Sequence, residues 1–201
     1  MSCDVLLVLA YDFLDTMAWD VAISAVLLAV GSLTLPYNAQ EGRIDDKARN
    51  MRLGFAITGG ASGFYLFLSG VSISLLWPFT LAGGVYNILF GGIATLGGLT
   101  VLAGSIALAI NVDLRPITYF ASVVGIYAII DAYAIIQHNL TNAPMVSALG
   151  YLSFAAPAIL SVPVARLGDK RWRILFAVFA FLFATAWLIQ AATFTLAHLA
   201  P

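Results

Sequence analysis

The stretch YNILFGGIATLGGLTVLAGSIALAINVDLRPITY, residues 86–119, decides the fold. It begins as a long apolar run with closely spaced glycines and ends in a short polar turn, DLRP at residues 113–116, before another apolar run starts. A run this apolar predicts a helix in lipid, and glycines at such intervals are typical of helices that pack closely against other helices. The stretch therefore predicts two membrane-spanning helices joined by a tight turn.

The composition of the whole chain agrees with a membrane protein. Of its 201 residues, 62% are hydrophobic and only 9% are charged, which is outside the range of soluble globular domains. The net charge of -1 provides no basic surface for nucleic acid, so we expect no nucleic-acid partner. The single cysteine, Cys3, excludes an internal disulfide and a thiolate metal cluster. We therefore predict an all-α polytopic membrane protein with lipid around it.

Six segments are long and apolar enough to cross about 30 Å of hydrocarbon, and we expect them to form a single transmembrane domain over residues 1–201. The predicted spans are 16–36, 51–78, 82–110, 117–137, 145–164 and 172–197. The apolar segment 3–15 is too short to span and contains three aspartates. It is interpreted either as an interfacial segment or as an extension of the first helix.

Basic residues decide the predicted topology. They flank or occupy the first, third and fifth loops, whereas the second and fourth loops and both tails carry none: Arg43, Lys47, Arg49, Arg52, Arg115, Arg166, Lys170, Arg171 and Arg173. The positive-inside rule then places these three loops in the cytoplasm and both termini outside. We expect a multi-pass protein of the cell membrane, in a prokaryotic inner or plasma membrane.

Polar side chains within the spans lie mainly on the predicted outer half. Four of them are candidates for an outer vestibule that offers hydrogen bonds to a solute: Asn87, Tyr127, Asp131 and Gln190. Tyr127, Asp131 and His138 share a helix face, so His138 could sense pH near Asp131. The alternative is that Asp131 and His138 only cap the wet end of a helix. We expect Tyr151 at a membrane interface, where tyrosines are common.

Catalysis and cofactor binding find little support. Two histidines near helix ends and scattered carboxylates match no metal-ligand spacing, and no nucleophile, phosphate loop or acid–base pair stands out. We therefore predict no metal, no cofactor and no enzyme activity.

Close packing is the commonest reason for glycines such as Gly63 on the second span, and the same holds for the glycine run on the third.

The region from Tyr86 to Tyr127 resembles the third and fourth helices of the urea/amide channel family (AmiS/UreI). The resemblance rests on Leu89-Phe90-Gly91, on the turn Asp113-Leu114-Arg115-Pro116 and on the aromatic pair Tyr119-Phe120. Gly59-Gly60-Ala61-Ser62 and Thr185-Ala186-Trp187 are similar to strings in the second and sixth helices of that family. Unlike the family, this chain has no tryptophan in its fifth span and has Phe181 near the position of an acidic residue.

This resemblance implies a ring of six protomers, each with its own pore for urea or a short amide. Leu89 and Phe90 would form part of an apolar constriction. The alternative is that Phe90 is an ordinary lipid-facing or packing residue. Asp113, Arg115 and Pro116 would form a structural turn.

A second, weaker resemblance is to the acetate uptake transporter family, which also forms six-helix protomers in rings of six. It rests on Leu53-Gly54-Phe55, on FGGIA at residues 90–94 and on LTNAP at residues 140–144. This resemblance implies the uptake of acetate or another weak acid. A third interpretation comes from a different class, in which the chain is a non-transporting accessory subunit of a membrane complex.

Overall fold

The computed structural model describes residues 3–35, 46–78, 84–141 and 143–199, and all regular structure in these ranges is helical. Its elements are α1 (Cys3–Thr34), α2 (Asp46–Leu76), α3 (Val85–Ala109), α4 (Arg115–His138), α5 (Pro144–Leu167) and α6 (Lys170–Leu199). Each helix contains a segment that is long and apolar enough to cross a membrane. The predicted all-α fold with six membrane-spanning helices is confirmed.

The helices extend beyond several of the predicted spans. α1 begins at Cys3, so segment 3–15 continues the first helix, although the apolar span within it begins only at Leu14. α2 begins at Asp46, five residues before the predicted start. Hydropathy marks only the apolar part of a helix, whereas the helix itself continues as long as its backbone hydrogen bonds do. The predicted end at 36 and start at 82 lie outside the described residues.

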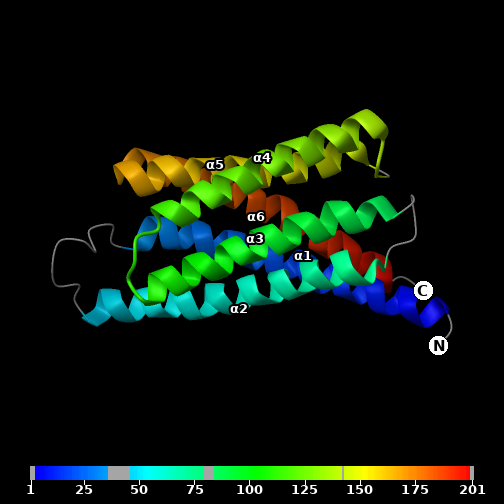
Figure 1. The fold of residues 1–201 in the computed structure, drawn as a ribbon, viewed down its shortest axis with the longest axis horizontal. Coiled ribbons are helices and arrows are strands. Elements are labelled where there is room, and N and C mark those ends of the chain that lie inside the picture. Colours follow the sequence, from blue (N-terminus) through cyan, green and yellow to red (C-terminus); the bar gives the residue numbers. More distant parts are fainter. Residues whose placement is uncertain (1–2, 36–45, 79–83, 142, 200–201) are drawn as a thin grey trace.

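The six helices close into a ring. Each helix packs against the next one along the chain, and α6 returns to pack against α1. Three antiparallel pairs are packed most closely, namely α2 with α3, α4 with α5, and α1 with α6 (Figure 1). The other three joints of the ring are looser. The fold is therefore a ring of three helix pairs.

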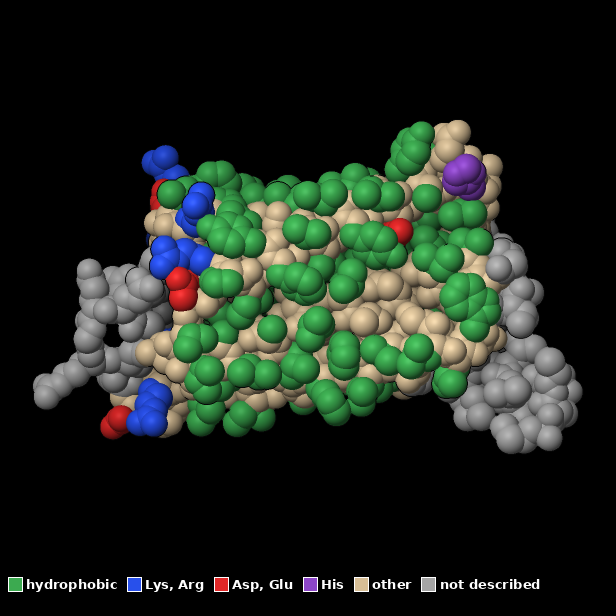
Figure 2. Space-filling model, in the orientation of Figure 1, with side chains coloured by type: hydrophobic (Ala, Val, Ile, Leu, Met, Phe, Trp, Pro, Cys, Tyr) green, Lys and Arg blue, Asp and Glu red, His purple; other side chains and the backbone are tan. Residues whose placement is uncertain are grey.

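Charge divides the two ends of this ring. The helix ends that carry the described Lys and Arg residues all lie at one end of the molecule, where Figure 2 shows the basic side chains gathered. The chain termini lie at the opposite end (Figure 1). Arg43 lies outside the described residues. The ring thus separates a basic end from an end that carries both termini, as the alternation of basic loops predicts.

Glycines allow the backbones of α2 and α3 to touch. A Cβ atom added to Gly63 would lie 2.5 Å from the backbone nitrogen of Leu102, and one added to Gly98 would lie 2.3 Å from that of Phe67. About two turns further along α2, Gly70 leaves a similar space for the backbone of α3. The close packing predicted for the glycines of these two spans is present, and Gly70 belongs to it as well.

The pair α1 and α6 uses alanines and one arginine. Ala22, Ala25 and Ala29 on α1 are fully buried, and the latter two pack in clusters with α6 side chains. At the basic end, the Arg173 guanidinium donates hydrogen bonds of 2.6 Å to the carbonyl oxygens of Ser32 and Leu35. Ser32 lies in the last turn of α1 and Leu35 directly follows the helix, so these carbonyls have no helical N–H partners.

The turn between α3 and α4 is held by its own side chains. Asp113 accepts a hydrogen bond from the Arg115 backbone N–H at 2.9 Å and a second from its side-chain Nε at 2.7 Å. These bonds, the side-chain one above all, lower the pKa of Asp113 from its usual value. The ion pair is therefore kept as pH falls through the ordinary range of an aspartate and is lost only below it. Pro116 follows in the first turn of α4, where no backbone N–H is needed.

We predict that Gly98→Ala lowers the temperature of unfolding in detergent. The added methyl group has to push the two backbones apart, and overpacking of this kind costs about 1–3 kcal/mol. Gly54→Ala is the matched control on α2, because a Cβ there meets nothing within 4 Å. Thermal unfolding followed by circular dichroism measures both variants. Equal unfolding temperatures for the two would contradict the backbone contact.

Candidate functional site

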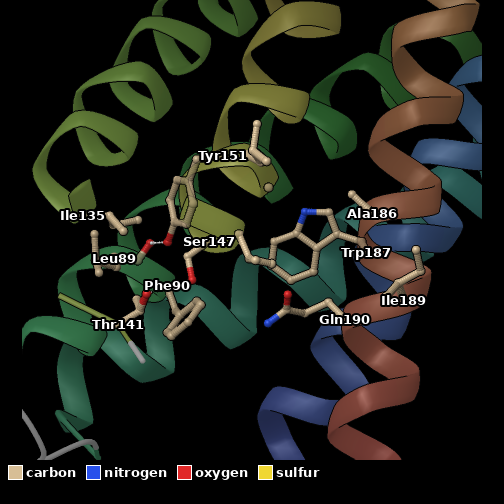
Figure 3. Close-up of a pocket in the computed structure, with 13 residues that line it drawn as sticks. Leu89, Phe90, Ile135, Thr141, Ser147, Tyr151, Ala186, Trp187, Ile189 and Gln190 are labelled. Atoms are coloured by element: carbon tan, nitrogen blue, oxygen red, sulfur yellow. Dashed lines mark hydrogen bonds between the residues drawn. The ribbon is translucent and has the colours of Figure 1, made fainter. Parts of the chain in front are cut away.

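A pocket of about 250 Å³ opens among four helices toward the end of the ring that carries the termini. Its walls come from α3, from α4 and the turn after it, from α5 and from α6 (Figure 3). The side chains that line it include Leu89, Phe90, Thr141, Ser147, Tyr151, Trp187 and Gln190. Most of the lining is apolar or aromatic, as in many sites for small molecules.

Several polar groups of the wall are already paired. The hydroxyls of Thr141 and Ser147 share a hydrogen bond of 2.9 Å, and the Tyr151 hydroxyl donates to the carbonyl oxygen of Leu89 at 2.9 Å. The Tyr151 bond ties α5 to α3 across the wall. It also fixes the ring of a side chain that is only 6% exposed.

One polar group on the α6 side faces the pocket. Figure 3 shows the Gln190 amide below the Trp187 indole, turned toward Phe90 across the pocket. The indole nitrogen Nε1 of Trp187 is buried, has no hydrogen-bond partner in the described part of the chain, and lies on the edge of the ring away from Gln190. An amide can therefore serve a polar molecule in an otherwise apolar space.

Aromatic rings continue from the pocket toward the basic end. Trp187 meets Phe183 edge to face with ring centroids 6.3 Å apart, and Phe183 meets Phe154 of α5 at 5.4 Å. We call Phe154, Phe183 and Trp187 the aromatic cluster. On the α3 side, Phe90 stacks on Tyr86 with centroids 6.0 Å apart. Large aromatic rings therefore lie on two opposite walls of the pocket, and those of α5 and α6 continue toward the basic end.

The pocket brings together three of the residues singled out from the sequence, Leu89, Phe90 and Gln190. Asn87 does not line it. This side chain is fully buried, and its amide donates to the carbonyl oxygen of Gly84 at 3.1 Å. Gly84 has φ of 83° and directly precedes α3. Asn87 therefore ties down the start of α3.

The remaining predicted residues lie on α4, away from the pocket lining. Asp131 is only 6% exposed, and its Oδ2 atom has no hydrogen-bond partner in the described residues. It lies close enough to Tyr127 and Tyr151 to interact with both electrostatically. The Tyr127 hydroxyl reaches α3 at Gly92, where a Cβ would come within 2.6 Å of it. His138 is exposed in the last turn of α4.

Part of this pocket was not predicted from the sequence. We expected Tyr151 at a membrane interface, but its side chain is buried and hydrogen-bonded to α3. Phe183, Trp187 and Gln190 follow one another at intervals of four and three, so they share one face of α6. That spacing of two aromatics and an amide was the signal that could have identified the α6 wall.

The arrangement suits binding or passage better than bond-making chemistry. Among the described residues, no group of three or more His, Cys, Asp or Glu side chains is placed to hold a metal ion. The pocket instead combines apolar walls, two aromatic faces and a few hydrogen-bonding groups. Such a lining accepts a small neutral polar molecule and disfavours a charged one, which would lose its hydration.

We predict that Tyr151→Phe lowers the unfolding temperature, because it removes the hydrogen bond to Leu89. The expected loss is about 0.5–1.5 kcal/mol, the usual contribution of a neutral hydrogen bond. Tyr133→Phe on α4 is the control, since Tyr133 is 67% exposed. If both variants unfold at the temperature of the unmodified protein, the bond contributes nothing to stability.

The comparison of structures and the comparison of sequences match this protein to different known proteins. The structure is similar to the cryo-EM structure of the Helicobacter pylori urea channel in its closed state, with a TM-score of 0.70 and 16% sequence identity. The match covers 93% of this chain and 100% of the urea channel chain. No curated protein sequence matches the chain. Residues 9–201 match the family model described as "Protein of unknown function (DUF981)". The chain therefore belongs to the DUF981 family.

Proposed function

We propose that this protein is a membrane channel for a small neutral polar solute, with urea or a short amide as the first candidates. The observation that carries the proposal is the pocket among four helices of a ring of six membrane-spanning helices. The fold it shares with a urea channel supports the same conclusion. The walls of this pocket all come from one protomer, so each protomer would contain its own path, and no cofactor is needed.

In this proposal the solute enters from the end that carries the termini. The Gln190 amide offers hydrogen bonds at the pocket, and Leu89 and Phe90 form part of the constriction. The aromatic cluster adds bulk from α5 and α6, where the AmiS/UreI family has tryptophans on the fifth helix. A narrow apolar section passes compact neutral molecules because charged ones face a desolvation barrier.

Further parts of the proposal concern the surroundings of this path. Asn87, Tyr127 and Asp131 remain candidates for solute contact, which would require movement of the pocket wall. His138 remains a candidate pH sensor, and an unchanged pH dependence of flux in His138→Ala would remove it. We propose that the termini face outward from a cell membrane and that six copies form a ring.

We predict rapid urea or acetamide flux through the purified protein in proteoliposomes. Stopped-flow light scattering should show solute entry that is clearly faster than in protein-free vesicles, because the pocket replaces part of the lost hydration. Acetate flux that increases as pH falls, beyond the vesicle leak, would favour weak-acid uptake instead. No flux of any of the three solutes from well-folded protein would favour an accessory subunit.

We predict that Phe90→Trp reduces this flux about tenfold or more, since a tenfold change needs only about 1.4 kcal/mol of additional barrier. The larger indole would fill the space opposite Trp187 and Gln190. Phe120→Trp is the matched control, because Phe120 lies on the outside of α4 and is 38% exposed. Equal flux through both variants would show that Phe90 does not line the path.

A further inference from the structure

A second polar feature lies apart from the pocket, at the loose joint between α1 and α2. Two stripes of polar side chains face each other there, spaced by four residues on α1 and by three and four on α2. They are Thr16, Asp20 and Ser24 on α1, and Ser62, Tyr65 and Ser69 on α2. We call these six residues the polar seam. The pocket is lined by α3, α4, α5 and α6 only, so the polar seam is a separate site.

Hydrogen bonds join the two stripes. The hydroxyls of Thr16 and Tyr65 lie 2.5 Å apart, and those of Ser24 and Ser62 also lie 2.5 Å apart. The Ser62 hydroxyl is within hydrogen-bonding range of the Asp20 carboxyl group and lies 3.5 Å from the Asp20 carbonyl oxygen. Ser24 and Ser62 are each 5% exposed. Oxygen atoms of Asp20, Ser24 and Ser62 therefore lie close together at this joint.

Two polar atoms of the seam lack a partner. The Oδ2 atom of Asp20 and the Oγ atom of Ser69 are buried without a hydrogen-bond partner in the described residues, and Ser69 is 1% exposed. Asp20 makes no ion pair within the same ranges. Two other titratable groups face this region, and each is hydrogen-bonded elsewhere. Tyr65 bonds Thr16, and Asp15 accepts a 2.7 Å bond from Thr195 of α6.

The depth of Asp20 makes a bare carboxylate costly. It lies six residues beyond Leu14, where the apolar span of α1 begins, which is about 9 Å along the helix axis. A carboxylate at such depth requires a compensating positive charge, from a side chain or from a bound ion. Oxygen ligands such as those around Asp20 are the ones that hard cations prefer. The described side chains offer no compensating charge, so a bound ion has to provide it.

We propose that the polar seam binds one small monovalent cation at Asp20, and that this positive charge neutralises the carboxylate within the membrane. Either a proton or Na⁺ could supply this positive charge, and the separate effects of pH and of sodium on thermal unfolding distinguish the two. The outer end of the seam, at Thr16 and Tyr65, would be the entry for the ion. The proposal does not depend on the channel function, because it concerns a different joint of the ring and can be tested without any flux.

The test is the thermal unfolding of the full-length protein in detergent. For Na⁺, replacing choline chloride with sodium chloride at equal ionic strength should raise the unfolding temperature by about 2 °C or more. For a proton, sodium should have no effect, and the unfolding temperature should rise from mildly alkaline to mildly acidic buffer. Asp20→Asn, which is neutral and of the same shape, should lose the response to sodium, or should weaken the response to pH, to which the buried Asp131 also contributes.

The control is Asp15→Asn, on the same helix and also hydrogen-bonded to a hydroxyl, which should keep the full response. Ser62→Ala should weaken the response, and it tests the site independently if Asp20→Asn does not fold. The proposal is overturned if neither ion affects the unmodified protein. It is also overturned if Asp20→Asn, or Ser62→Ala in its place, responds as strongly as the unmodified protein.

Discussion

Helices within a lipid bilayer gain no hydrophobic stabilisation from touching one another, because lipid tails are as apolar as leucine. Their association depends on close packing, and close packing depends on small residues at the contacts. In this ring, Gly63, Gly70 and Gly98 bring α2 against α3, and Gly125 brings α4 against α5 with a Cβ position only 3.0 Å from Ala158. Alanines do the same for α1 and α6.

Polar groups lie both within and between the close pairs. Arg173 and Thr195 of α6 bond to α1 within one pair, and other polar side chains lie at the looser joints between pairs. The joint of α1 and α2 holds Asp20 and Ser62, and the joint of α3 and α4 holds Tyr127 against Gly92. Near the joint of α5 and α6, the pocket exposes Trp187 and Gln190.

The sequence was sufficient to predict the number of helices, their approximate spans and the end of the molecule that carries the basic residues. These features follow from hydropathy and charge, which are properties of single segments. The neighbours of each helix face are a different matter. Periodicity showed that Tyr127 and Asp131 share a face, but it could not show that this face meets α3 and α5 beside the pocket wall.

The same limit explains Asn87 and Tyr151. An asparagine near the start of a span is equally compatible with a vestibule and with a bond to its own helix terminus, and in this structure the Asn87 amide donates to the Gly84 carbonyl oxygen. A tyrosine near a helix end is usually interfacial, yet the Leu89 carbonyl provides Tyr151 with a partner inside the ring. Both outcomes depend on contacts between segments that are distant in sequence.

The contact of Arg173 with the end of α1 has a consequence for how the protein is made. The carbonyl oxygens of Ser32 and Leu35 leave the ribosome early, but the guanidinium that binds them is synthesised about 140 residues later, as the sequence separations of 141 and 138 show. A nascent chain with five inserted helices is therefore still an open arc. The carbonyl oxygens at the end of its first helix lack their partner until the last helix is synthesised. The ring can therefore close only after the whole chain has been translated.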